Sequence, residues 1–304
     1  MRALIEREHE VTALARHTSR TALVEELGAK VFRAGFEEEE ALRRACDGNE
    51  VVVHAAGGGI SRRSADIYRG NTASTVALAA AAERAGVRRF VLVSSLAAHG
   101  GSRAGRPARE SDADDPKSHY GRSKLAAERA LMRTSLEVTM LRPPALYGPG
   151  EHRMVALFRA AERGLVPTVF PEGTLSMLHG ADCAEVLVSA VEADAAHGVL
   201  YVAEPRVYTR RRMAELVGAA VGRRVRVLSL PPILPRGASV LAEASAWVSR
   251  RPVFLTRDKV RDILEPHQSC VPERAERALG WSATRRFDGG AREAYLDYRR
   301  RGWL

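Results

Sequence analysis

Phe90-Val91-Leu92-Val93-Ser94-Ser95 decides the fold, because four consecutive apolar residues end in two hydroxyls. An apolar run without alternation predicts a strand that is buried on both faces. Comparable runs occur at residues 11–15, 30–32, 51–55 and 138–141, and helical patterns fill the intervals at 21–27, 38–46, 65–85 and 118–134. This order of strand and helix predicts an α/β fold with a doubly wound, Rossmann-type parallel sheet.

The pattern changes beyond Gly150, where helices alternate with isolated short strands at 200–202 and 225–228. We therefore expect one doubly wound domain over residues 1–150. Residues 151–304 are expected to form a smaller, mainly substrate-binding lobe, with some segments returning to the sheet. Within this lobe, residues 232–250 form an amphipathic, Ala-rich stretch that suits a hydrophobic substrate or a membrane surface. We expect this stretch to be buried against the lobe.

The composition is that of an ordinary folded chain, with 45% apolar and 28% charged residues among 304. The formal charge of +10 comes from scattered arginines, since only four of 47 basic residues are lysines. Basic and aromatic residues do not interleave, so we expect no nucleic-acid partner. Cys46, Cys183 and Cys270 lack CxxC spacing, which predicts neither disulfides nor a metal site. We also expect no transmembrane segment, no signal peptide and a cytoplasmic location.

The candidate chemistry lies in Ser118-His119-Tyr120-Gly121-Arg122-Ser123-Lys124. Tyr120 and Lys124 are four residues apart, which places both side chains on one face of a helix. An ammonium beside a phenol lowers the phenol pKa from about 10, so the tyrosine can exchange a proton with an alcohol or a carbonyl. The same spacing also fits a solvated helix face. Because Ser95 ends a buried strand at the carboxyl edge of the sheet, where ligands bind in such folds, we predict Ser95, Tyr120 and Lys124 as catalytic residues.

These residues resemble the extended short-chain dehydrogenase/reductases, which include NAD-dependent epimerases and dehydratases, dihydroflavonol reductases and 3β-hydroxysteroid dehydrogenases. In that family a strand ending in Ser-Ser is followed after 25 residues by the Tyr of a Y-G-x-S-K motif, as Ser95 and Tyr120 are here. The resemblance implies that Tyr120 gives or takes the proton and that Ser95 orients the carbonyl. It also implies that Lys124 tunes Tyr120 and holds the nicotinamide ribose.

Other segments extend the resemblance over nearly the whole chain. It implies that residues 1–150 are an N-terminally incomplete, dinucleotide-binding Rossmann domain. Val51-Val52-Val53-His54-Ala55-Ala56-Gly57 looks like the fourth strand of the family and the turn beneath the adenosine half of the cofactor. Asn71 fits an N-x-x-G-T helix start, although Ser74 replaces the Gly. Residues 141–150 are similar to the R-P-x-x-x-Y-G-P-G segment that closes over the nicotinamide. The cofactor-binding residues that the resemblance implies are His54, Ala55, Ala56, Gly57, Asn71, Ser94, Tyr120, Lys124, Pro143 and Pro144.

The sequence departs from the family at its start, where the first strand and the Gly-rich G-x-x-G-x-x-G turn are missing. We expect that the functional chain begins upstream of Met1; the alternative is a truncated product with impaired cofactor binding. The missing strand belongs between the second and fourth strands of the family's sheet. After the second strand, Arg16 and Arg20 stand where NAD-preferring relatives carry an acidic residue. Because arginines suit a 2′-phosphate, we expect NADP rather than NAD, although a solvated loop explains these arginines equally well.

Three functions remain open from the sequence. The first is an NAD(P)-dependent oxidoreductase that transfers a hydride between the nicotinamide and a carbonyl or secondary alcohol, with a small, hydrophobic molecule as substrate. The second is a nucleotide-sugar epimerase; Leu96-Ala97 replaces the acidic pair of dehydratases and argues against dehydration. The third is a non-catalytic dinucleotide-binding or assembly protein, since a fold does not imply activity. Relatives commonly pair through long helices, so a homodimer is possible.

Overall fold

The computed structural model describes residues 1–304 except 59–60, 62, 196–197 and 250–254. The strands are β1 Thr12–Ala15, β2 Lys30–Arg33, β3 Val51–His54, β4 Arg89–Val93, β5 Glu137–Arg142, β6 Ala145–Tyr147, β7 Leu165–Thr168, β8 Thr174–His179, β9 Gly198–Tyr201, β10 Val207–Thr209 and β11 Arg226–Ser229. The α-helices are α1 Arg2–Ile5, α2 Ala22–Glu26, α3 Glu39–Cys46, α4 Ser64–Tyr68, α5 Ser74–Arg84, α6 His119–Leu131, α7 Val155–Glu162, α8 Gly180–Glu192, α9 Arg210–Ala220, α10 Ile233–Ser249, α11 Arg257–Ile263, α12 Glu273–Leu279 and α13 Phe287–Arg300. Between these lie the π-helical turn η1 Arg69–Ala73 and the 3₁₀ turns η2 Leu96–Ala98 and η3 His152–Met154.

The main sheet has four parallel strands in the order β3-β4-β5-β9. Strands β1 and β2 form a second, parallel pair. Within the described residues no backbone ladder joins β1 to β3, so the parallel strands fall into two sheets. Leu14 of β1 and Phe32 of β2 nevertheless pack in the same core cluster as Phe90 of β4. The predicted α/β class with a Rossmann-type parallel sheet is confirmed.

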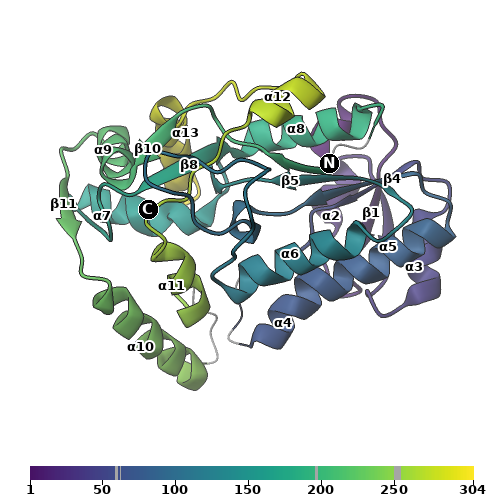
Figure 1. Ribbon diagram of the computed structural model, residues 1–304, viewed down its shortest axis with the longest axis horizontal. Coiled ribbons are helices and arrows are strands. Elements are labelled where there is room, and N and C mark those ends of the chain that lie inside the picture. The colour runs from purple at the N-terminus through teal and green to yellow at the C-terminus, as the bar shows by residue number, and fades with distance from the viewer. Residues whose placement is uncertain (59–60, 62, 196–197, 250–254) are drawn as a thin grey trace.

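The apolar core lies on both faces of the main sheet. Along β4, Phe90 and Leu92 pack with α3, α5 and α6, whereas Val91 packs with α8 and α12. Val138 and Leu141 of β5 divide between the same two clusters. In Figure 1, α5 and α6 lie on one side of this sheet and α8 and α12 on the other. The unbroken apolar runs of the sequence therefore serve two buried faces.

The C-terminal half contributes small sheets and helices beside the main sheet. Strand β8 pairs with β6 in parallel and with β10 in antiparallel orientation, and β7 pairs with β11 in parallel. Their core is aromatic: Phe158, Phe287 and Tyr298 are fully buried among α7, α9 and α13. Strand β9 belongs to the main sheet, so the chain returns to it after leaving it.

Most strands and helices predicted from the sequence occur within a few residues of their expected bounds. The expected burial of residues 232–250 is wrong for the large side chains of α10, because Ile233, Leu234, Val240 and Leu241 are more than half exposed. Residue 250 of that stretch lies outside the described residues. Within the described part of the chain, no helix is both long and apolar enough to cross a membrane.

Candidate active site

The predicted catalytic residues come from two elements that meet at the carboxyl end of β4. Ser95 follows β4 and begins η2, where its hydroxyl accepts a hydrogen bond from the Ala97 amide at 3.2 Å. Tyr120 lies in the first turn of α6, and α6 packs against η2, which begins at Ser95. Burial raises the pKa of Tyr120, while the Ser95 hydrogen bond and the charge of Arg153 lower it. The structure thus brings the predicted hydroxyl and phenol together.

Lys124 lies one helical turn after Tyr120 and is buried, with 5% of its surface exposed. Its Nζ donates a hydrogen bond to the Val93 carbonyl at 3.1 Å, at the end of β4. Burial lowers the pKa of Lys124 to about 8, although the nearby Glu128 carboxylate acts in the opposite direction. The positive charge that acts on the Tyr120 phenol is that of Arg153. A direct effect of Lys124 on Tyr120 therefore stays a prediction.

Gly57 and Asn71 enclose the ammonium of Lys124 from the other side. A Cβ on Gly57 would lie 2.6 Å from Asn71 Oδ1 and 3.0 Å from Lys124 Nζ, so no side chain fits there without movement. The Asn71 side chain binds the Gly58 amide and carbonyl at 3.1 and 2.8 Å, and it donates to Ser123 Oγ at 2.9 Å. Asn71 lies in the π-helical turn η1, a geometry that is frequent at functional sites. It fixes the loop after β3 against α6.

A buried ion network supports this side of α6. Arg142, at the end of β5, donates from Nε and Nη2 to both carboxylate oxygens of Glu128 at 2.9 and 2.5 Å. It also binds Asp114 at 2.6 and 2.9 Å. Ser94 Oγ donates to Glu128 as well. Burial alone raises the pKa of Asp114, but hydrogen bonds from His99 and Arg142 outweigh it and lower the pKa to about 2.

The C-terminal half holds the N-terminus of α6. The Asp258 carboxylate of α11 accepts hydrogen bonds from the backbone amides of His119 and Tyr120 at 2.6 and 3.1 Å. These are among the amides that a helix leaves without an internal partner. One turn later, Asp262 Oδ2 is buried without a hydrogen-bond partner in the described part of the chain. Burial raises the pKa of Asp262, and its charge raises that of Tyr120.

The other predicted cofactor residues lie around this centre in different environments. His54 is buried against Phe36 and Phe90, and burial lowers its pKa to about 4. Its Nε2 lies 3.3 Å from Ser74 Oγ, so the imidazole faces the core rather than solvent. The residues that follow strands are Ala55, Ala56 and Gly57, exposed after β3; Pro143, buried, and Pro144, partly buried, after β5; and Arg16 and Arg20, exposed after β1.

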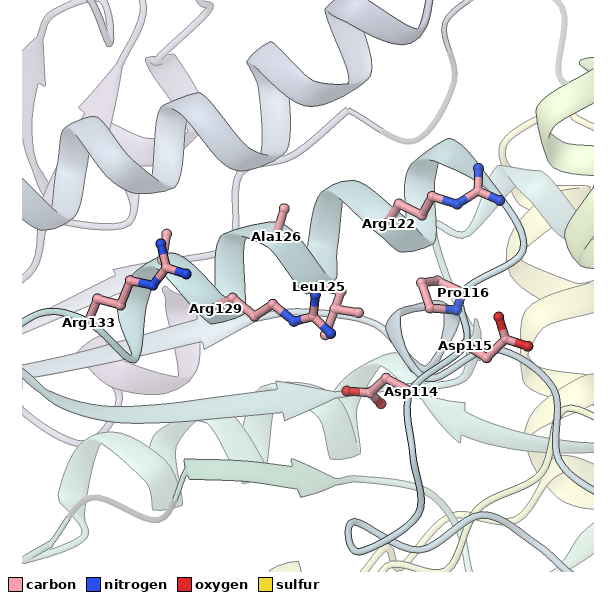
Figure 2. Close-up of a pocket in the computed structure, with 9 residues that line it drawn as sticks. Asp114, Asp115, Pro116, Arg122, Leu125, Ala126, Arg129 and Arg133 are labelled. Atoms are coloured by element: carbon pink, nitrogen blue, oxygen red, sulfur yellow. The ribbon is translucent and has the colours of Figure 1, made fainter.

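A groove of about 560 Å³ runs along the outer face of α6. Figure 2 shows Arg122, Arg129 and Arg133 along the helix, with Asp114 and Asp115 on the facing loop. Tyr120 and Lys124 are not part of its lining. The groove is therefore distinct from the predicted catalytic centre.

Sequence reasoning missed several residues of the site. Glu128 had a usable signal, because it continues the four-residue spacing of Tyr120 and Lys124 along one helical face. Arg33 had none: its guanidinium holds the loop of Arg16 through that residue's carbonyl at 3.4 Å and the Ser19 carbonyl at 3.2 Å. Asp258 also had none, because it lies more than a hundred residues from the helix that it caps.

A hydroxyl and a phenol at the carboxyl end of a central parallel strand, above a buried lysine, define a Rossmann-type oxidoreductase class. Comparison with known proteins narrows this class. A family model described as NAD(P)H-binding matches residues 1–194. The chain belongs to this NAD(P)-binding family, within the extended short-chain dehydrogenases/reductases, as the sequence motifs predicted.

The relatives include reductases and epimerases. The chain is 30% identical over 284 residues to a protein named ceramide reductase from Caulobacter vibrioides, covering 92% of this chain and 83% of that protein. It is 39% identical over 101 residues to a UDP-glucose 4-epimerase from Vibrio cholerae, covering 31% of each. The crystal structure of a Thermotoga maritima UDP-glucose 4-epimerase with UDP-glucose matches with a TM-score of 0.77 at 19% identity, over 98% of this chain and 94% of that one. At that identity the likeness concerns the fold alone.

The residues around Lys124 fit the ribose side of a nicotinamide cofactor. The ammonium carries three donors, and the described residues supply one hydrogen-bond acceptor, the Val93 carbonyl. The loop at Gly57 approaches the ammonium so closely that a Cβ there would lie 3.0 Å from Lys124 Nζ. The Gly-rich turn that binds pyrophosphate in relatives is not in this sequence, so no contact to that part of the cofactor follows from these residues.

Proposed function

We propose that this protein is an NAD(P)-dependent reductase or dehydrogenase that interconverts a ketone and a secondary alcohol on a long-chain lipid. The observation that carries the proposal is the packing of α6, which bears Tyr120 and the buried Lys124, against η2 at the end of β4, where Ser95 lies. The ceramide reductase relative, which aligns over 92% of the chain, supports a lipid substrate.

The chain's own residues account for proton transfer and orientation. The bound cofactor supplies or accepts the hydride. Tyr120 donates the proton to the carbonyl oxygen during reduction, and its raised pKa keeps the phenol protonated for that step. The Ser95 hydroxyl, already beside the phenol, orients the same oxygen. Two donors of the Lys124 ammonium remain to hold the ribose hydroxyls, and exposed Arg16 and Arg20 suit a 2′-phosphate.

The test is NADPH- and NADH-dependent turnover with a ceramide whose secondary hydroxyl has been oxidised to a ketone. We expect Tyr120→Phe to lower turnover by roughly 10²–10⁴-fold, while NADPH binding, followed by its fluorescence, stays unchanged. Tyr295→Phe is the matched control. The Tyr295 phenol donates a hydrogen bond to Glu162 at 3.1 Å, and this pair is not part of the predicted site. Wild-type turnover in Tyr120→Phe would overturn the catalytic assignment.

The second candidate is a nucleotide-sugar epimerase, supported by the Vibrio cholerae relative. An epimerase returns the hydride to the same substrate, so it needs no net cofactor turnover. Conversion of UDP-glucose without change in NADH absorbance would favour this candidate, and net NADPH oxidation with the ketone would exclude it as the main activity.

A further inference from the structure

Helix α10 places four large apolar side chains toward solvent. Ile233, Leu234, Val240 and Leu241 are 66%, 52%, 51% and 73% exposed. Their spacings of one, six, seven and eight residues place all four within about 120° of one another around the helix axis, on one side of the helix. The opposite side is packed on the protein through small residues: Ser239 and Ala246 are each 1% exposed. The usual orientation of an amphipathic helix on a protein core is thus reversed.

Contacts with α11 fix this orientation. Glu243, on the inner side of α10, accepts hydrogen bonds from the Arg257 backbone amide and Nε, both at 2.7 Å. Figure 1 shows α10 at the outer edge of the molecule, beyond α11. We call the outward face formed by Ile233, Leu234, Val240 and Leu241 the α10 surface. Because four aliphatic side chains in water are unfavourable, this surface needs an apolar partner.

The charges around the α10 surface indicate the chemistry of that partner. Residues 222–242 contain four arginines, Arg223, Arg224, Arg226 and Arg236, and no acidic residue. All four are exposed, and none forms an ion pair with any residue that the structure describes. Arg236 stands on α10 itself, beside the apolar side chains. An apolar helical face with an arginine at its edge and further unpaired arginines in the preceding segment is the pattern of helices that lie in the surface of an anionic bilayer.

A second copy of the chain fits this surface less well. A two-fold dimer would face the α10 surface with itself and bring the arginines of both copies together. The one carboxylate of α10, Glu243, is mostly buried and already paired with Arg257, so it is not available to these arginines. The phosphate groups of anionic lipids supply those partners, and the acyl region receives the aliphatic side chains.

We propose that the α10 surface is a membrane-binding face that places α10 flat on an anionic bilayer. The helix has 17 residues and does not qualify as a membrane-spanning segment, so it lies on the bilayer rather than crosses it. The proposal goes beyond the proposed function. It also gives a physical link to the site, because α11 packs between α10 and the N-terminus of α6 and caps the latter through Asp258.

The experiment is co-sedimentation of the full chain with vesicles of phosphatidylcholine alone and of phosphatidylcholine with phosphatidylglycerol. We expect binding to the anionic vesicles. Leu234→Ser with Leu241→Ser should lower the partition coefficient on the order of 100-fold, because two leucines that the bilayer would bury are lost. Arg236→Gln should lower it about fivefold. The control Leu23→Ser with Met132→Ser, at two side chains that are each 64% exposed elsewhere, should bind as the wild type does.

Three outcomes would overturn the proposal. One is no binding to either vesicle. Another is binding that salt abolishes and the double leucine variant leaves unchanged, which would be adsorption through arginines alone. The third is a dimer in sedimentation equilibrium that the same double variant dissociates, without vesicle binding by the wild type. Circular dichroism of each variant checks that it is folded, and the assay requires neither cofactor nor turnover.

Discussion

Replacing Glu128 with Gln removes one charge from the buried network behind Lys124. Glu128 and Arg142 each expose 3% of their side chains, and both carboxylate oxygens accept from the guanidinium. The amide of the substituted side chain would point its NH₂ group at a donor of Arg142 or at the Ser94 hydroxyl. Glu128→Gln therefore leaves a buried cation with one carboxylate partner, Asp114, in place of two.

The magnitude follows from this geometry. Breaking a buried ion pair costs about 3–5 kcal/mol, and we expect about 3 because Asp114 still binds Arg142. For a chain of this size that corresponds to a melting temperature lower by roughly 5 °C. Activity should change as well, because the Glu128 carboxylate raises the pKa of Lys124 against the effect of burial. Without it the Lys124 pKa falls below about 8, and the ammonium form is lost at a lower pH.

The assays are thermal unfolding followed by circular dichroism and the pH profile of turnover between pH 6 and pH 9. The control is Glu215→Gln, which removes an exposed helical ion pair with Arg212 at 3.3 Å. That pair is worth roughly 0.3–0.5 kcal/mol, so its removal should move the melting temperature little. An equal loss of melting temperature in both variants would refute the reasoning, as would a basic limb of the pH profile that stays in place in Glu128→Gln.

Two further predictions concern carboxylates outside this network. Burial raises the pKa of Glu204 to about 7, although hydrogen bonds from the Phe287 amide and Tyr208 oppose it. Because the unfolded chain releases this proton near pH 4.5 and the folded chain near 7, stability falls as pH rises between these values. Glu204→Gln should therefore melt at a higher temperature than the wild type at pH 8 and show a smaller difference at pH 4. The reverse order of these differences would contradict the assignment. Asp258→Ala should destabilise the protein by about 1 kcal/mol through loss of the α6 cap and should lower turnover. Asp258→Asn keeps a hydrogen-bond acceptor, so it should retain most of the stability and most of the turnover. Equal melting temperatures and turnover in Asp258→Ala and the wild type would show that the cap is dispensable.

The fold was predictable because its signal is local. The strands of the main sheet and of the β1–β2 pair contain apolar runs such as 51–53 or 90–93. A strand that is buried on both faces shows such a run instead of an alternation of apolar and polar residues. The strands β6, β7, β8 and β10 were not predicted, since they are three to six residues long and carry polar or proline residues, such as Pro167 in β7. Their pairing depends on partners that lie far away in the sequence.

The orientation of α10 could not be predicted for a different reason. Hydrophobic periodicity predicts an amphipathic helix, but it does not state what the apolar side contacts. The usual assumption, that this side faces the core, places Leu241 inside and Ser239 outside. The structure has the opposite arrangement, with Leu241 73% exposed and Ser239 1% exposed. The deciding contact is Glu243 with Arg257, a pairing between two helices that periodicity within one helix does not encode.

The candidate site likewise combines residues that a local pattern predicts with residues that come from distant parts of the chain. Tyr120, Lys124 and Glu128 follow one another at four-residue intervals, so a single helical face presents the phenol, the ammonium and the carboxylate that keeps the ammonium charged. What positions that face comes from elsewhere in the chain: Arg142 from β5 binds its far end, and Asp258 from α11 caps its near end. Helix α11 contacts both sides: its Arg257 binds Glu243 of α10, and its Asp258 accepts the hydrogen bond of the Tyr120 amide. Helix α6 is therefore the element of the predicted site that the C-terminal half contacts, and substitution of Asp258 removes this contact while leaving the Tyr120 side chain unchanged.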